Sequence, residues 1–171
     1  FPGTMGAKFI DYIIADQYLI PPDNSKYFTE KQLHLPNTFM PTDNSREFSN
    51  RFISRQEMGL PDKAFVFCCF NNNYKITDVE FDIWMRLLIK VKGSILWLRR
   101  SNEQSNQNIM IAAQKRNIDP SRLVFADKLP MDEHLSRHKL ADLFIDTFAF
   151  NAHTTTTEAL WAGLPVVTKQ G

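Results

Sequence analysis

Residues 64–98 read AFVFCCFNNNYKITDVEFDIWMRLLIKVKGSILWL and contain one complete strand–helix–strand unit. The run 64–70 is continuously apolar, which is typical of a strand that is buried on both faces of a sheet. Thr77 and Glu80 form a capping-box pattern that marks a helix start, and Gly93 is suited to the helix end. Residues 94–98 form the next strand. The spacing therefore predicts a parallel β–α–β unit.

The same alternation continues along the chain after this unit. The pattern predicts strands over residues 122–125 and 141–145 and from 165 onward, and helices over residues 103–116, 130–138 and 154–162. Such crossovers place helices on both faces of a parallel sheet. We therefore predict an α/β fold with a Rossmann-like parallel sheet. Ligands of such sheets bind beyond the carboxyl ends of the strands, so the loops there hold the candidate site residues.

The chain before this unit has a weaker pattern. A β-rich apolar run at 9–15 and a second short strand at 32–35 flank a short helix that opens at Pro22. Residues 37–60 are polar and irregular, and one short helix is predicted within them, around 46–58.

Three parts follow from these patterns. We predict that residues 1–40 end an N-terminal lobe, that 41–60 form a linker, and that 61–171 form most of a C-terminal lobe. Both ends of the chain look cut from a longer protein, so we expect a fragment.

The composition narrows the class of protein. Hydrophobic residues make up 43% and charged residues 23% of the 171 residues, as in soluble globular domains. The formal net charge of +1 gives no global field, so neither nucleic acid nor a membrane is an expected partner. Cys68 and Cys69 are strand neighbours that point to opposite faces, which argues against a disulfide between them and fits a cytoplasmic location. No Asp-x-Asp pattern or cluster of metal ligands occurs in the sequence, so no metal or other cofactor is expected.

The loop after the first strand of this unit, 71–76, is rich in polar groups. Three asparagines are followed by Tyr74 and Lys75 just before a helix start. A mobile cation at this place can meet a diphosphate. The alternative is a solvated turn with a surface lysine, and the position alone does not decide between the two. After the third strand, His134 lies one turn into a short helix, where it can contact a nucleobase or be a partly exposed helical histidine.

The stretch 146–158 reads DTFAFNAHTTTTE and is the most unusual in the chain. Free amides and hydroxyls at a helix start favour an anion site, and Glu158 can accept hydrogen bonds from a ribose diol. The alternative is an ordinary capping box between Thr155 and Glu158. Capping needs one threonine rather than four and has no need of His153, so we favour the anion site.

Together these motifs resemble a known family. The chain carries Pro2-Gly3-Thr4-x-Gly6, FIDYIIAD, FNNNYKI, SILWLRR, EHLSRHKLADLFIDT and NAHTTTTEALWAGLPVVT in one order. In this it is similar to the O-linked N-acetylglucosamine transferases, including their bacterial relatives and the plant SPINDLY-type proteins. The resemblance implies a GT-B architecture of two Rossmann-like lobes, usually behind a helical TPR array. It also implies metal-independent, inverting transfer of a sugar from a nucleotide diphosphate to Ser or Thr of a protein.

The resemblance also assigns roles to residues. Lys75 matches the family lysine that stabilises the diphosphate leaving group and is the catalytic candidate. His134 matches a histidine near the uracil, and Glu158 takes the ribose-binding position. The donor-binding candidates are Asn72, Tyr74, Lys75, Leu129, His134, Arg137, His153, Thr154, Thr155 and Glu158.

Two departures from the family pattern leave the donor open. Met131 stands where animal members carry a lysine, and Glu158 replaces the more common aspartate. The second departure, with the threonine-rich entry, is more typical of SPINDLY-type members, which use GDP-fucose. UDP-N-acetylglucosamine is the favoured donor. The alternatives are GDP-fucose, a different GT-B enzyme such as an Asn-glucosyltransferase, and a non-catalytic nucleotide-binding module. A general base is not identifiable in the sequence, so we expect no turnover by residues 1–171 alone.

Overall fold

The structure, a computed structural model, describes residues 3–169, so Pro2 of the N-terminal motif lies outside the described residues. The chain forms two compact units, Phe1–Asn44 and Ser45–Gly171. Residues 45–60, which fall within the predicted linker 41–60, belong to the second unit.

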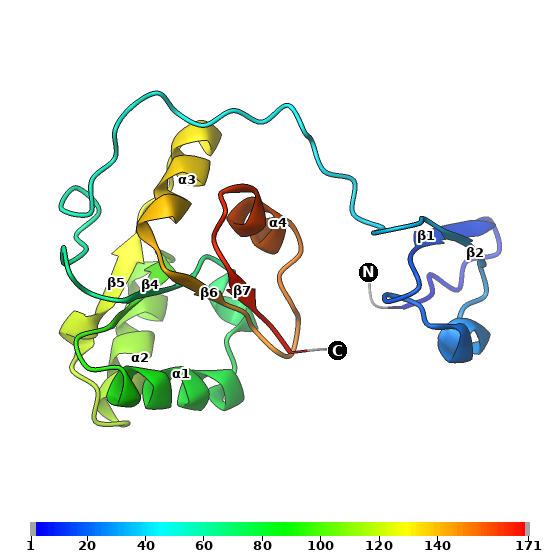
Figure 1. Ribbon diagram of the computed structural model, residues 1–171. Helices are drawn as coiled ribbons and strands as arrows, with labels where there is room; N and C mark the ends of the chain where they lie inside the picture. The colour runs from blue at the N-terminus through cyan, green and yellow to red at the C-terminus, as the bar shows by residue number, and fades with distance from the viewer. Residues whose placement is uncertain (1–2, 170–171) are drawn as a thin grey trace. The chain divides into compact units, whose positions relative to one another are not determined.

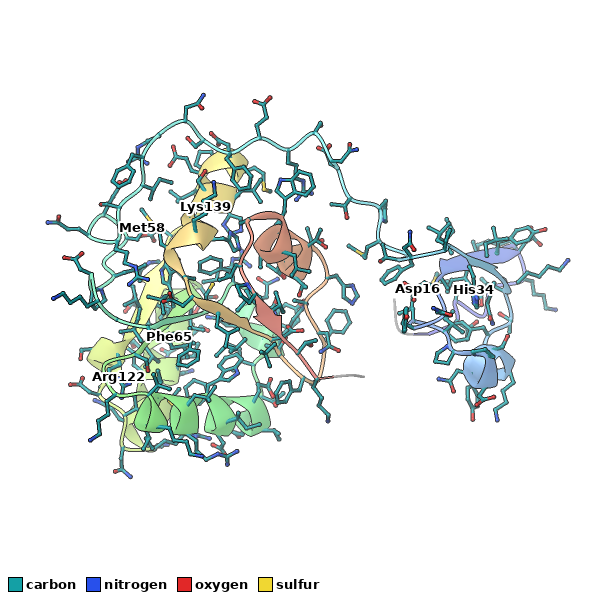
Figure 2. The ribbon with its side chains drawn as sticks, in the orientation of Figure 1. Asp16, His34, Met58, Phe65, Arg122 and Lys139 are labelled. Carbon is teal, nitrogen blue, oxygen red and sulfur yellow. The ribbon has the colours of Figure 1, made fainter. Side chains whose placement is uncertain are left out.

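The first unit contains a two-stranded parallel sheet. Strand β1 (Tyr12–Ala15) pairs with β2 (Lys31–His34), and a 3-10 helix, η1 (Pro22–Tyr27), connects them. Asp16, labelled in Figure 2 beside His34, directly follows β1 and accepts hydrogen bonds from the N–H groups of Tyr18, Leu19 and Phe39. These backbone donors explain why the chain turns sharply after β1.

The second unit is a five-stranded parallel sheet with the order β5-β4-β3-β6-β7. Its strands are β3 (Val66–Cys69), β4 (Ile95–Arg99), β5 (Leu123–Ala126), β6 (Leu143–Ile145) and β7 (Val166–Val167). Every residue of β3 is buried, which agrees with its continuous apolar run and its central place in the sheet.

Helices cover both faces of this sheet. The α-helices are α1 (Asp78–Lys90), α2 (Glu103–Gln114), α3 (Met131–Arg137) and α4 (Thr154–Trp161), with 3-10 helices η2 (Asn73–Lys75), η3 (Pro120–Arg122) and η4 (His138–Leu140). Figure 1 shows α1 and α2 on one side of the sheet and α3 and α4 on the other. Right-handed crossovers require this arrangement, because the chain moves outward from β3 to β5 and then returns to the other side of β3. The predicted α/β fold is confirmed.

The core lies between the sheet and these helices. Trp84 of α1, Trp97 of β4 and Phe144 of β6 are among its largest fully buried side chains. Arg122, labelled in Figure 2, donates hydrogen bonds to the carbonyl oxygens of Leu88 and Ser94 and so ties the end of α1 to the start of β4. The capping box between Thr77 and Glu80 is present, as the sequence predicts.

The short helix predicted around 46–58 is wrong, because the structure shows turns and no helix there. The segment is instead held by polar contacts to α3. The Ser49 N–H donates to Ser136 Oγ at 2.9 Å, and Arg51 pairs with Glu133 at 2.9 Å. Polar residues without an apolar stripe gain more from these contacts than from a helix.

Candidate functional site

The candidate site lies between β3 and β6, where the order in which the chain adds strands to the sheet switches from one side to the other. Strands β3 and β6 are neighbours, but the chain leaves β3 towards β4 and leaves β6 towards β7 on the opposite side. In open parallel sheets the loops after two such strands diverge and leave a crevice, which is the usual ligand site. The loops that follow β3 and β6 are the polar stretches 71–76 and 146–153.

A pocket of about 300 Å³ opens at this crevice. It brings together seven of the predicted donor-binding residues, from three separate stretches of the chain: Asn72, Lys75, Leu129, His134, Arg137, Thr155 and Glu158. The other three, Tyr74, His153 and Thr154, do not line it. Tyr74 is 80% exposed, so any contact with a ligand requires the ligand to extend beyond the pocket.

Lys75 is half-buried rather than a freely solvated surface lysine. Its Nζ lies 3.4 Å from the carbonyl oxygen of Asn151 and 4.3 Å from the centroid of the Phe150 ring. The Phe150 ring also lies 5.3 Å from that of His153. Burial, together with the nearby Lys75 charge, lowers the pKa of His153. The cation therefore lies between the two loops and close to the start of α4.

The start of α4 has no side-chain cap. His153 is the N-cap residue, and its side chain accepts no capping hydrogen bond from the first N–H groups of the helix. The alternative capping box between Thr155 and Glu158 is absent. Thr155 Oγ1 instead donates to Asn71 Oδ1 at 2.6 Å, and Glu158 faces α3. The amides of a helix start carry partial positive charge and favour an anion there.

Glu158 is 5% exposed and has two basic partners. Its carboxylate oxygens lie 3.3 Å from His134 Nε2 and 3.4 Å from Arg46. Burial by itself would raise the pKa of Glu158, but the hydrogen bond from His134 and the nearby positive groups outweigh it, so the pKa is lowered. The side chain is an ionised acceptor at neutral pH and can take hydrogen bonds from hydroxyl groups.

Aromatic and basic side chains stack beneath His134. The Arg137 guanidinium lies 4.5 Å from the centroid of Phe70, and Arg137 donates to the carbonyl of Asp127 at 2.5 Å. Burial lowers the pKa of Arg137 to about 10, which leaves it charged at neutral pH. The rings of Phe70 and His134 are 5.5 Å apart. This cluster gives the pocket a partly aromatic wall, and aromatic side chains can contact a planar base.

His138 supports the same wall from below and is fully buried. Its Nδ1 lies 2.7 Å from the carbonyl oxygen of His134 and donates to it, while its Nε2 is buried and has no partner among the described residues. Protonation would place a charge and an unsatisfied N–H in the core. Burial, and next the neighbouring His134, therefore lower the pKa of His138 from 6.5 to about 4.

This shift predicts acid sensitivity. The pKa of His138 is lower in the folded state than in the unfolded state, so the unfolded chain binds the proton first as the pH falls. The contribution of neutral His138 to stability is therefore complete above pH 6.5 and is lost as the pH falls towards 4. We expect the free energy of unfolding to fall by about 2–3 kcal/mol over that range. Urea titrations followed by tryptophan fluorescence measure it, because all three tryptophans lie in the second unit. His138→Phe should flatten this part of the profile, and exposed His34→Phe should not. An unchanged slope in His138→Phe would contradict the assignment.

Two residues that the sequence reasoning did not select organise the site. The buried Asp146 carboxylate accepts hydrogen bonds from Asn71 Nδ2 at 2.9 Å and from the N–H groups of Thr147 and Ala152 at 2.7 and 2.9 Å. Asn71 also accepts from Thr155 Oγ1, so the network joins β3, β6 and α4. The signal was present, because both residues directly follow an apolar strand.

The pocket holds more basic side chains than the residues predicted from the sequence would supply. Arg99, Arg100 and Lys128 line it together with Lys75 and Arg137, against two acidic side chains, Asp127 and Glu158. Arg99 is the last residue of β4 and Arg100 follows it, and neither is among the donor-binding residues predicted from the sequence. The excess of cations favours an anionic ligand.

Other classes of site are not found in the described residues. Within residues 3–169, no group of three or more His, Cys, Asp or Glu side chains is arranged to hold a metal ion. None of the helices described has the length and apolar character needed to cross a bilayer.

Comparisons with known proteins agree on one family. The family model described as glycosyl transferase family 41 matches residues 1–52 and 47–171. A probable UDP-N-acetylglucosamine–peptide N-acetylglucosaminyltransferase, SEC of Arabidopsis thaliana, is 35% identical over 98% of this chain and 18% of its own length. The corresponding transferase of Caenorhabditis elegans is 44% identical over 67% of this chain and 10% of its own length.

More distant relatives and a solved structure give the same result. A probable transferase of the SPINDLY type from Solanum lycopersicum is 29% identical over 100% of this chain and 18% of its own length. A solved mutant of the Thermobaculum terrenum O-GlcNAc transferase matches all of this chain and 32% of its own, with a TM-score of 0.81 and 27% identity. The chain thus spans less than a fifth of the length of these curated relatives. The chain belongs to glycosyl transferase family 41.

Proposed function

We propose that this chain is the donor-binding part of an inverting protein O-glycosyltransferase that moves N-acetylglucosamine from UDP-N-acetylglucosamine to Ser or Thr of a protein. The relatives that cover most of this chain carry names of UDP-N-acetylglucosamine–peptide N-acetylglucosaminyltransferases. The proposal includes a protein acceptor, a TPR array on a longer chain, and a cytoplasmic location.

The observation that carries the proposal is the pocket at the crevice between β3 and β6. It combines a cation, Lys75, an acid, Glu158, and a partly aromatic wall that includes His134 within about 300 Å³. The start of α4, at His153 and Thr154, lies next to it. These groups match the three parts of the nucleoside diphosphate in a nucleotide sugar: a diphosphate near Lys75 and the α4 amides, a ribose at Glu158, and a base at His134.

The proposed chemistry places the catalytic role on Lys75. When the bond between the sugar and the diphosphate breaks, negative charge grows on the leaving phosphate oxygen. A fixed ammonium group and helix amides stabilise that charge without the help of a divalent ion. The group that accepts the proton of the Ser or Thr hydroxyl is proposed to lie in the rest of the longer protein, so residues 1–171 alone should bind nucleotide without transferring sugar.

A second donor, GDP-fucose, is favoured by one observation. Glu158 with the four threonines Thr154–Thr157 is closer to the SPINDLY-type pattern than to that of the animal enzymes. The identities weigh in the other direction, since the SEC and C. elegans transferases are 35% and 44% identical and the SPINDLY-type relatives 27–29%. UDP-N-acetylglucosamine therefore remains the proposed donor.

Thermal shift measurements on the 171-residue chain test the donor. A ligand that binds only the folded state raises the melting temperature more, the larger its concentration is relative to its Kd, so UDP and UDP-N-acetylglucosamine should raise it more than GDP and GDP-fucose at equal concentration. Glu158→Gln removes a charged acceptor and should weaken UDP binding about 10-fold. Glu103→Gln, an exposed change on α2, should not. The proposal fails if none of the four nucleotides shifts the melting temperature at millimolar concentration.

A further inference from the structure

A second and larger cavity lies outside the donor pocket. It has a volume of about 630 Å³ and runs between the first turns of α1 and the exposed side of α2, and we call it the α1–α2 groove. Its polar wall consists of Asn73, Thr77, Asn102, Gln104, Ser105 and Asn108, and its apolar floor of Ile76, Phe81, Ile109 and Ala112. The donor site described above uses none of these residues.

The groove is almost uncharged. Its only charged lining residue is Asp78, and the Asp78 carboxylate is already paired with Arg116 at 2.9 Å. The remaining polar groups are amides and hydroxyls. The two helix starts that border it are already capped, α1 by the Thr77–Glu80 box and α2 by Asn102, and Asp78 adds a negative charge. The surface therefore suits a neutral ligand that carries both hydrogen-bond donors and acceptors better than it suits a phosphate.

Several of its amide groups are available to a ligand. Asn102 Oδ1 accepts from the Ser105 N–H at 2.8 Å, while no residue of the described chain is seen to accept from Asn102 Nδ2. Asn108 Oδ1 accepts from Gln104 Nε2 at 3.0 Å, which leaves the Asn108 Nδ2 group as a donor. Asn73 Nδ2 points to Ser105 Oγ at 3.3 Å, which leaves Asn73 Oδ1 as an acceptor. The groove thus offers both donors and an acceptor, and the N–H and C=O groups of an extended peptide can pair with groups of both kinds.

The size of the groove agrees with a short peptide segment. Along α2 it extends from Asn102 to Ala112, which at 1.5 Å per residue is about 15 Å. An extended chain rises about 3.3 Å per residue, so about four or five residues fit. The half-buried Ile76 and Ile109 offer apolar contacts to small side chains on the inner face of such a segment.

One short element joins the groove to the donor site. The 3-10 helix η2 (Asn73–Lys75) contributes Asn73 to the groove and Lys75 to the donor pocket. A peptide held in the groove therefore passes within a few residues of the proposed leaving group. We propose that the α1–α2 groove binds an uncharged, extended segment of the acceptor polypeptide that flanks the modified Ser or Thr. The role of the peptide as a sugar acceptor rests on the proposed function, whereas binding of a peptide to the groove can be measured independently of it.

Nuclear magnetic resonance on the ¹⁵N-labelled chain tests the proposal. The probes are an end-blocked eight-residue peptide of Ala, Val, Ser and Thr, the same peptide with Glu at alternate positions, and tri-N-acetylchitotriose. We expect the uncharged peptide to shift the side-chain amide signals of Asn102 and Asn108, and the acidic peptide and the sugar to bind at least 10-fold more weakly. Preferential binding of the sugar, or no shift with any probe, would overturn the proposal.

A pair of matched variants locates the binding. Asn108→Arg places a charge and a long side chain in the groove, and Gln107→Arg places the same side chain on the same helix outside it. Each change removes one exposed side-chain pair between residues four apart on α2. Asn108→Arg should weaken peptide binding at least 10-fold and Gln107→Arg less than twofold, and equal losses would overturn the proposal. UDP is titrated in parallel: peptide binding without UDP binding supports the groove and contradicts the proposed function alone.

Discussion

Replacement of Lys75 by alanine is expected to lower kcat for sugar transfer about 100- to 1000-fold in a longer protein that contains this chain. The Lys75 ammonium lies between the loop after β3 and the loop after β6, near the start of α4. Removal of one fixed donor that stabilises developing negative charge has an effect of this size in other enzymes. Because the charge grows mainly in the transition state, the affinity for UDP should change less than kcat does.

Two controls separate this effect from a loss of folding. Lys92→Ala removes an exposed lysine just beyond the C-terminal end of α1 and should leave kcat within twofold. Lys75→Arg keeps the charge and should retain more activity than Lys75→Ala. Lys75 contacts Asn151 and Phe150, so the melting temperature of each variant is measured alongside the initial rate. A kcat within fivefold of the original in a folded Lys75→Ala protein would remove Lys75 from the proposed mechanism.

Much of the fold can be predicted from the sequence because local signals and the global arrangement agree. The apolar run around Val66–Cys69 is continuous and short, which favours a buried strand, and the Thr77–Glu80 box places the start of α1 correctly. The segment 46–58 could not be predicted in this way. Its conformation depends on partners about 80 residues away, such as Ser136 and Glu133, and no local pattern encodes them.

The candidate site is likewise predictable from the sequence only in part. The rule that ligands bind beyond strand ends led to Lys75, His134 and Glu158, and the structure brings all three to one pocket. The rule gives no information on which polar groups bind a ligand and which hold the loops. Asn71 and Asp146 belong to the second kind, and only the distances between them show it. The same rule applies to Arg99 and Arg100, because they lie at the carboxyl end of β4 and line the same pocket.

Replacement of Asp146 by alanine is expected to lower the free energy of unfolding of the second unit by about 4 kcal/mol. Its carboxylate is the shared acceptor for two backbone N–H groups, those of Thr147 and Ala152, and for the side chains of Asn71 and Thr168. These donors are mostly buried, and each one left without a partner costs about 1–3 kcal/mol. Urea denaturation followed by tryptophan fluorescence measures the change, since Trp84, Trp97 and Trp161 all lie in this unit.

Asp146→Asn distinguishes the network from simple loss of a buried side chain. The amide keeps one acceptor oxygen and nearly the same volume, but its NH₂ group faces donors that need an acceptor, so we expect about half of the loss seen with alanine. Because Asn71 links Asp146 to Thr155 at the start of α4, both variants should also weaken UDP binding, although Asp146 does not line the pocket. Exposed Asp132→Asn, on α3, serves as the matched surface change. If Asp146→Ala cost no more than Asp132→Asn, the loops after β3 and β6 would be held by backbone packing rather than by this carboxylate. The positioning of Lys75 and α4 would then need another explanation.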